Sequence, residues 1–157
     1  MNAFIPFKEW GDFVLGGSRM QPAKRVNIVS LKLIREGSVL YRERRVQSPE
    51  DGYQLLKCAD REVFVVVCLD TKNQPTAILI CGEFECKPEV FKSAILANAA
   101  SVLVAHNHPP TDPTPSREDI EVTRRLVEAG RIVGIELLDH VVVSGERFVS
   151  LKEKGYV

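Results

Sequence analysis

The stretch SVLVAHNHPPTDPTPSRED, residues 101–119, carries most of what the chain reveals about its fold and chemistry. It begins with an apolar run that has the length and composition of a buried strand. His106 and His108 follow. Because strand side chains repeat with a period of two, both imidazoles can leave the strand end on the same side. A proline-rich loop then leads to Ser116 and Asp119, where a helix is predicted to start.

Two neutral imidazoles and one carboxylate form a ligand set that catalytic zinc uses, with a further position left open for water. We therefore expect His106, His108 and Asp119 to bind one Zn²⁺ per chain. A simpler interpretation makes Ser116 the helix N-cap and Asp119 an acid that favours the helix dipole. The two interpretations are compatible, since a residue that starts the helix can also face a metal site.

Length and composition predict a single domain. A chain of 157 residues that is 45% hydrophobic can bury a core of its own. We expect one domain over 1–157, with a motif-bearing core at 50–157 and 1–24 as a candidate loosely structured N-terminal extension. The net charge of zero implies no broad attraction to nucleic acid or to an anionic membrane.

The cysteines and the absence of apolar spans indicate the compartment. None of the four cysteines forms a Cys-x-x-Cys pair, and they stand at Cys58, Cys68, Cys81 and Cys86. We expect Cys68 and Cys81 to be small core residues on strands. No signal sequence and no long apolar span is recognisable. The sequence therefore predicts a cytoplasmic protein with reduced thiols that does not enter a membrane.

Strand and helix patterns alternate along the chain. The predicted strands are 26–34 paired with 39–46, then 62–69, 75–84, 101–105, 135–143 and 147–151. The predicted helices are 48–59, 88–98 and 116–129, the last ending at Gly130. The apolar runs 63–67 and 77–80 are typical of strands covered on both faces. We therefore expect an α/β fold with three layers, in which helices flank a mixed sheet.

The motif His106-x-His108-Pro109 followed by Ser116-x-x-Asp119 resembles that of the JAB/MPN (JAMM) metalloproteases. Other stretches are similar to the RadC-like bacterial branch, namely LDTKN at 69–73, PEVFK at 88–92, NAA at 98–100 and LDH at 138–140. The resemblance covers about Glu50 to the C-terminus and implies the cytidine-deaminase-like JAB/MPN fold. The first fifty residues depart from it, since they do not resemble the helical region found upstream in longer members.

Hydrolysis by a metal-activated water also needs a carboxylate that takes the proton of the water and delivers it to the leaving amine. Spacing alone does not choose among the candidates, which are Glu62, Glu83, Glu85, Glu89 and Glu118. In JAMM proteins the catalytic glutamate lies ahead of an early strand, some tens of residues before the first histidine. By that resemblance we expect Glu62 to be the general base, with Glu85 as runner-up. The resemblance also implies that Ser116 helps to hold the oxyanion.

Asp139 and His140 form a second acid–histidine pair, on a predicted late strand. Such a pair could orient a metal ligand, because ligating imidazoles usually donate their other N–H to a second group. More often it is structural, and we favour that role.

The predicted function is that of a zinc metallopeptidase or isopeptidase acting on a protein or peptide substrate. The alternatives are a DNA-repair-associated RadC-like accessory protein and a non-catalytic interaction module on the same fold. Neutral charge and the lack of a recognisable DNA-binding module argue against direct contact with nucleic acid. A silent module would have no need of all three ligands. A zinc deaminase would need His-x-Glu and Pro-Cys-x-x-Cys, which this chain lacks.

Overall fold

The computed structural model describes residue 37 and residues 45–56, 62–81, 87–108 and 112–157. These residues fall within one compact unit, Lys32–Val157. Their elements, in chain order, are α1 (Pro49–Leu56), β1 (Phe64–Leu69), β2 (Pro75–Cys81), α2 (Lys87–Leu96), β3 (Ser101–Asn107), α3 (Arg117–Val133), β4 (Glu136–Ser144) and β5 (Arg147–Ser150). The predicted extension 1–24 and nearly all of the predicted hairpin lie outside the described residues. A single domain over 1–157 stays a prediction.

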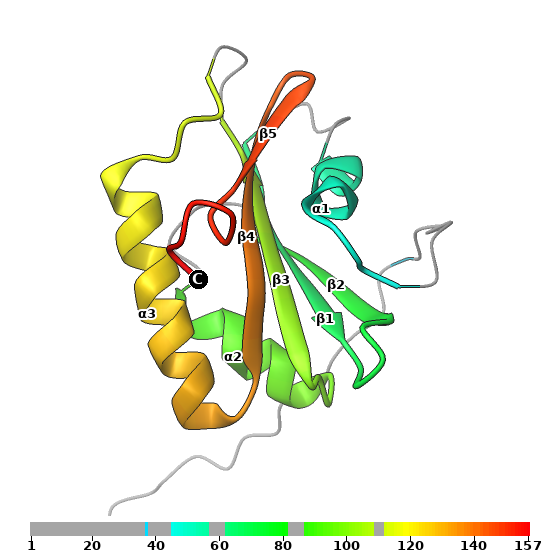
Figure 1. Ribbon diagram of the computed structural model, residues 1–157. Helices are drawn as coiled ribbons and strands as arrows, with labels where there is room; N and C mark the ends of the chain where they lie inside the picture. Colours follow the sequence, from blue (N-terminus) through cyan, green and yellow to red (C-terminus); the bar gives the residue numbers. More distant parts are fainter. Residues whose placement is uncertain (1–36, 38–44, 57–61, 82–86, 109–111) are drawn as a thin grey trace, which may run out of the picture. The chain divides into compact units, whose positions relative to one another are not determined.

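The described strands form one mixed sheet between two helical layers. The strand order is β2-β1-β3-β4-β5. β1 pairs antiparallel with β2 and β3, β3 pairs parallel with β4, and β4 returns antiparallel into β5. Helix α1 covers one face of the sheet, and α2 and α3 cover the other (Figure 1). The predicted three-layer α/β architecture is confirmed.

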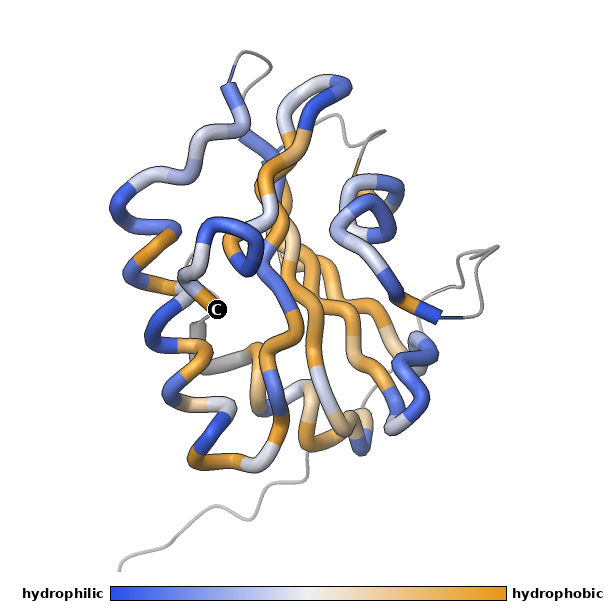
Figure 2. The backbone as a smooth tube through the Cα atoms, viewed as in Figure 1, coloured by the Kyte–Doolittle hydropathy of each residue, from blue (hydrophilic) through white to orange (hydrophobic). Residues whose placement is uncertain are grey.

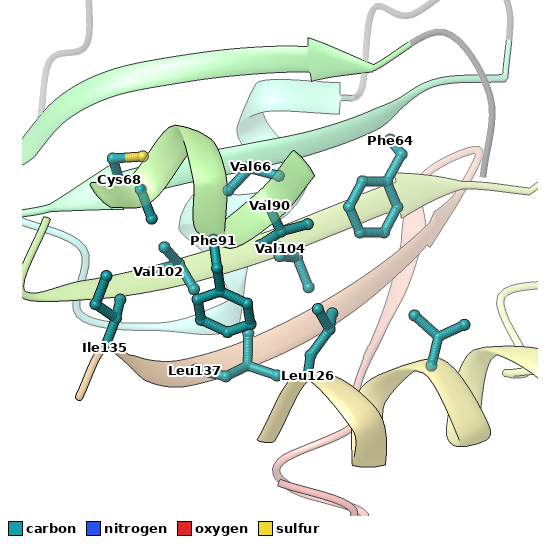
Figure 3. Close-up of a cluster of buried hydrophobic side chains, with 12 residues drawn as sticks. Phe64, Val66, Cys68, Val90, Phe91, Val102, Val104, Leu126, Ile135 and Leu137 are labelled. Carbon is teal, nitrogen blue, oxygen red and sulfur yellow. The ribbon is translucent and has the colours of Figure 1, made fainter. Parts of the chain in front are cut away.

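Each face of the sheet has its own hydrophobic core, because alternate residues of the central strands point to opposite sides. The core under α2 and α3 contains Phe64, Val66 and Cys68 of β1 (Figure 3). The core under α1 contains the odd-numbered residues of the same strand. Figure 2 shows β1 as hydrophobic along its length and β4 as interrupted by a hydrophilic stretch, whereas α3 is hydrophobic mainly along the side that faces the sheet.

The two apolar strands that begin the described sheet differ in coverage. All six residues of β1 are buried, as predicted. Those of β2 are only partly buried, and Ile80 is 68% exposed. The prediction that 77–80 is covered on both faces therefore holds only in part: Ala77 and Leu79 pack against one core and Ile78 against the other, but Ile80 is uncovered.

Helix α3 ends later than the sequence predicted. It runs to Val133 and is capped by Gly134, whose φ of 79° is the left-handed conformation that favours glycine. Gly130 lies inside the helix. A Cβ there would lie 2.5 Å from the carbonyl oxygen of Ile135 and 3.3 Å from the ring of Phe91. Gly130 is thus explained by a close tertiary approach and not by helix termination.

A bulge interrupts the pairing of β3 with β4. Val102 lies opposite Leu137, but Leu103 lies opposite Asp139, so Leu138 is an extra residue on β4. The bulge shifts every later residue of β4 by one position relative to β3.

Within the described ranges, no helix has both the length and the apolar character that crossing a bilayer requires.

Candidate metal centre

The three predicted metal ligands come from the end of one strand and the start of one helix. β3 runs through Asn107, so His106 lies inside the strand and His108 one residue beyond it. Asp119 lies in the first turn of α3, which begins at Arg117. Each of the three side chains offers one ligand atom, and these atoms all lie within 4.8 Å of one another. The structure therefore brings together the residues that the sequence motif selected.

The side chains approach one another through atoms that can bind a metal. His106 Nε2 lies 2.9 Å from His108 Nε2 and 3.2 Å from Asp119 Oδ1, and His108 Nε2 lies 3.3 Å from Asp119 Oδ2. In a tetrahedral zinc site with bonds of about 2.0–2.1 Å, ligand atoms are roughly 3.3 Å apart. Two imidazole nitrogens and a carboxylate this close must share a proton or a cation, since each offers lone pairs. The donor set fits a divalent metal ion.

The cluster is buried on one side and open on the other. His106 and Asp119 are buried, whereas His108 is only half-buried. Burial by itself raises the pKa of the Asp119 carboxyl, but the adjacent imidazole of His106 and the N–H of Ser116 outweigh that effect. Together they hold the pKa well below its ordinary value, so the carboxylate is ionised at neutral pH. It can therefore bind a cation without first losing a proton.

Ser116 fixes the orientation of Asp119. The backbone N–H of Ser116 donates to Asp119 Oδ2 at 2.6 Å, and the backbone N–H of Asp119 donates to Ser116 Oγ at 3.1 Å. This is a capping box, so the predicted role of Ser116 as helix N-cap is confirmed. The same carboxylate closes the helix end with Oδ2 and presents Oδ1 to His106. The hydroxyl of Ser116 keeps a proton that it can donate.

A buried chain of hydrogen bonds leads away from His106. Its Nδ1 lies 2.8 Å from His140 Nε2, and His140 Nδ1 lies 2.6 Å from the hydroxyl of Thr123. That hydroxyl donates to the backbone carbonyl of Asp119 at 2.7 Å. Burial, followed by the neighbouring imidazole of His106, lowers the pKa of His140 to about 3, so this ring is neutral at physiological pH. Thr123 was not predicted from the sequence, although its position four residues after Asp119 on one predicted helix was available as a signal.

Asp139 and His140 serve separate purposes, although they are neighbours in sequence. The carboxylate of Asp139 accepts hydrogen bonds from the backbone N–H groups of His140 and Lys152 and from the hydroxyl of Ser150, at 2.6–3.0 Å. It thereby ties the turn after β5 to β4. The favoured structural role fits Asp139, whereas His140 contacts a candidate metal ligand.

The position of Glu62 follows from strand pairing. Phe64 lies opposite His106 in the antiparallel pair of β1 and β3. One step further, the N–H of Val63 donates to Asn107 Oδ1 at 2.7 Å, and the N–H of Asn107 donates to the carbonyl of Val63 at 3.4 Å. Glu62 is exposed and lies two residues before Phe64. The pairing therefore places its segment beside the strand end that carries both histidines.

Two of the other predicted acids lie on helices, and two lie outside the described residues. Glu118 is exposed in the first turn of α3. Glu89 lies on α2. Glu83 and Glu85, the latter the runner-up for the general base, fall in the range 82–86, outside the described residues.

Comparison with known proteins identifies the family. The family model described as "RadC-like JAB domain" matches residues 46–156. A UPF0758 protein of Geobacillus sp. (strain WCH70) is 50% identical over 122 aligned residues, which cover 71% of this chain and 54% of that protein. The UPF0758 protein YsxA of Bacillus subtilis (strain 168) is also 50% identical, with coverages of 71% and 53%. A UPF0758 protein of Methanosarcina barkeri is 44% identical over 125 residues, with coverages of 73% and 55%.

This chain spans about half the length of these curated relatives. The matched range contains all three candidate ligands together with Glu62, Ser116, Thr123 and His140. By sequence, by its mixed sheet between helical layers and by its His-x-His and Ser-x-x-Asp motif, the chain belongs to the RadC-like JAB domain family.

Proposed function

We propose that this domain is a zinc-dependent metallopeptidase or isopeptidase that hydrolyses an amide bond in a protein or peptide substrate. The observation that carries the proposal is the convergence of two imidazole Nε2 atoms and an ionised carboxylate at a partly open sheet end. Three protein ligands and one remaining position are typical of catalytic zinc, whereas structural zinc is enclosed by four. A bound zinc ion would supply Lewis-acid chemistry, lowering the pKa of water and polarising a carbonyl.

Glu62 is the proposed general base and acid. Its support is the pairing of β1 with β3, in which Phe64, two residues after Glu62, lies opposite the candidate ligand His106. The carboxylate is exposed, so it can exchange protons with water and with a leaving amine. Asn107 holds this segment against β3 through its amide oxygen. It therefore acts as a positioning residue for Glu62.

Ser116 is the proposed oxyanion donor. Its Oγ already accepts the N–H of Asp119 and so lies beside the carboxylate ligand, with its own O–H free to turn toward a substrate oxygen. A donor of this kind is worth about 3 kcal/mol of barrier when it faces developing charge.

The first test measures metal content. Protein purified without chelators should contain about one zinc per chain. The His106→Ala and His108→Ala variants should lose it, while Glu62→Gln should retain it. A wild-type protein that takes up no zinc would overturn the proposal.

The second test measures hydrolysis. A proteome extract is incubated with the zinc-loaded domain, and new amino termini and newly free lysine side chains are quantified by mass spectrometry. Wild type should generate new amino termini, newly free lysine side chains, or both. Glu62→Gln and His106→Ala should generate neither product. Glu118→Gln, an exposed acid next to Asp119, is the matched control and should keep activity. Zinc binding without any cleavage would favour the non-catalytic module, and full activity of Glu62→Gln would move the acid/base role to another residue.

A further inference from the structure

We propose that His140 and Thr123 are positioning residues that set the tautomer of His106, so that the lone pair of its Nε2 faces the metal. The inference rests on the proposed metal site and concerns residues to which neither the motif nor the family match gives a role. Its basis is a buried path of hydrogen bonds that starts at one ligand, His106, and ends on the backbone of another, Asp119.

Proton counting along the path fixes the direction of each bond. The carbonyl oxygen of Asp119 can only accept, so the single proton of the Thr123 hydroxyl is directed to it. The same hydroxyl then presents a lone pair to His140 Nδ1, which must be the protonated nitrogen of that neutral ring. His140 Nε2 is therefore the acceptor, and His106 Nδ1 donates to it.

The consequence falls on the other nitrogen of His106. A neutral imidazole carries one N–H, and here it is on Nδ1. Nε2, the atom that lies 2.9 Å from His108 Nε2, therefore offers its lone pair. If the path ran in the opposite direction, His106 would carry its proton on Nε2, directed at His108 and Asp119, and could not bind a cation there.

Packing holds the path in place. His106, Thr123 and His140 are each at most 1% exposed, so water does not compete for these bonds. The ring of Phe64 stacks on His106 with centroids 6.2 Å apart and meets His140 edge-on at 5.9 Å. The bulge at Leu138 sets His140 opposite Val104, on the same face as His106. A side chain that only filled the core would not need this alignment of polar atoms.

The experiment compares two substitutions of Thr123. Thr123→Val keeps the shape and removes the hydroxyl, whereas Thr123→Ser keeps the hydroxyl. Zinc affinity is measured by competition with a chromophoric chelator, and ¹⁵N chemical shifts of the histidine rings report the tautomer of His106 in zinc-free protein. We expect Thr123→Val to weaken zinc binding by about 10–100-fold, the usual effect of losing an outer-shell partner, and Thr123→Ser to remain close to wild type. The spectra should show Nδ1 protonated in wild type and in Thr123→Ser, and a population protonated on Nε2 in Thr123→Val.

Two further comparisons guard against a purely structural effect. Ser150→Ala removes another buried hydroxyl, one that donates to Asp139 and lies outside the path. It should lower stability without changing zinc affinity. His140→Leu removes the acceptor for His106 Nδ1 and should weaken zinc binding. His140→Gln can place an amide oxygen near the position of the imidazole Nε2, so it should bind zinc more tightly than His140→Leu.

The outcomes separate this inference from the proposed function. Unchanged zinc affinity and an unchanged His106 tautomer in Thr123→Val would overturn the positioning role and leave the zinc site intact. A wild type that binds no zinc would overturn the proposed function, while the ring spectra would still decide whether Thr123 sets the tautomer. Equal losses of zinc affinity in Thr123→Val and Thr123→Ser would also overturn the inference, because a packing defect would then explain both.

Discussion

Replacing Gly130 by alanine should destabilise this domain, although the same change stabilises most helices. Gly130 lies within α3, where alanine is favoured over glycine by about 1 kcal/mol. The new Cβ would lie 2.5 Å from the carbonyl oxygen of Ile135, and ordinary van der Waals contact begins near 3.4 Å. The carbonyl must therefore retreat by about 0.9 Å, the difference between these two distances.

That retreat is hindered by the hydrogen bonds around the helix end. The N–H groups of Gly134 and Ile135 both donate to the carbonyl of Gly130, at 2.8 and 3.0 Å. Phe91, 3.3 Å from the new methyl, is buried in the core under α2 and α3. Overpacking against such a fixed neighbour costs about 1–3 kcal/mol, and weakening one backbone hydrogen bond adds about 1 kcal/mol. After the helical preference is subtracted, we expect a net loss of about 1–3 kcal/mol.

Urea unfolding at neutral pH measures the difference in the free energy of unfolding between Gly130→Ala and wild type. Gly134→Ala is the comparison, because its φ is 79° and nothing lies within 4 Å of the added Cβ. Its cost, about 1 kcal/mol, would come from backbone conformation alone. A Gly130→Ala variant as stable as wild type, or more stable, would show that the backbone between α3 and β4 moves aside at little energetic cost. In that case the close approach would not explain the glycine.

Three further outcomes are expected from the described contacts. Asp139→Ala should lower the free energy of unfolding by about 3 kcal/mol, because it leaves buried donors, including the hydroxyl of Ser150, without an acceptor. Asp139→Asn should lower it by less, and zinc affinity should be unchanged in both variants. Asn107→Leu should cost about 1–2 kcal/mol by removing the acceptor for the N–H of Val63 and should reduce turnover while zinc stays bound, whereas Asn107→Asp should keep both properties closer to wild type. In zinc-free protein, the pKa of His140 is about 3 in the folded state, against about 6.5 in the unfolded chain. Between these two pH values the unfolded chain binds a proton on His140 that the folded protein does not bind. The free energy of unfolding should therefore fall on acidification by up to about 1.4 kcal/mol per pH unit. Unfolding curves at several pH values should show a weaker dependence in His140→Gln, and parallel curves for the two proteins would contradict the assignment.

The three candidate ligands were predictable because their placement depends on local rules. A period of two carries His106 and His108 to one side of a strand end, and a capping pattern orients Asp119 at the first turn of a helix. Only the meeting of these two local structures required the fold. Glu62 was selected by resemblance and stays a prediction; the pairing of Phe64 with His106 places its segment beside the strand end that carries the histidines.

Gly130 shows where local rules mislead. A glycine after an amphipathic run is a common end of a helix, so the pattern favoured termination there. The carbonyl that excludes a side chain at this position belongs to Ile135, after the chain has left the helix. Local patterns do not contain that approach, which depends on how α3 returns into β4.

His140 could not have been assigned from the sequence, because its face is decided by an irregularity. In an unbroken strand, Leu137 and Asp139 would share a face, and His140 would point to the other side. Leu137 does pack in the core under α2 and α3. The extra residue Leu138 then inverts the alternation, so that His140 and not Asp139 turns toward that same side. Without the bulge, His140 would lie opposite Ala105 and face α1, away from His106. Bulges often re-aim a side chain beside a functional site, and this one joins β4 to the candidate metal centre through a single imidazole.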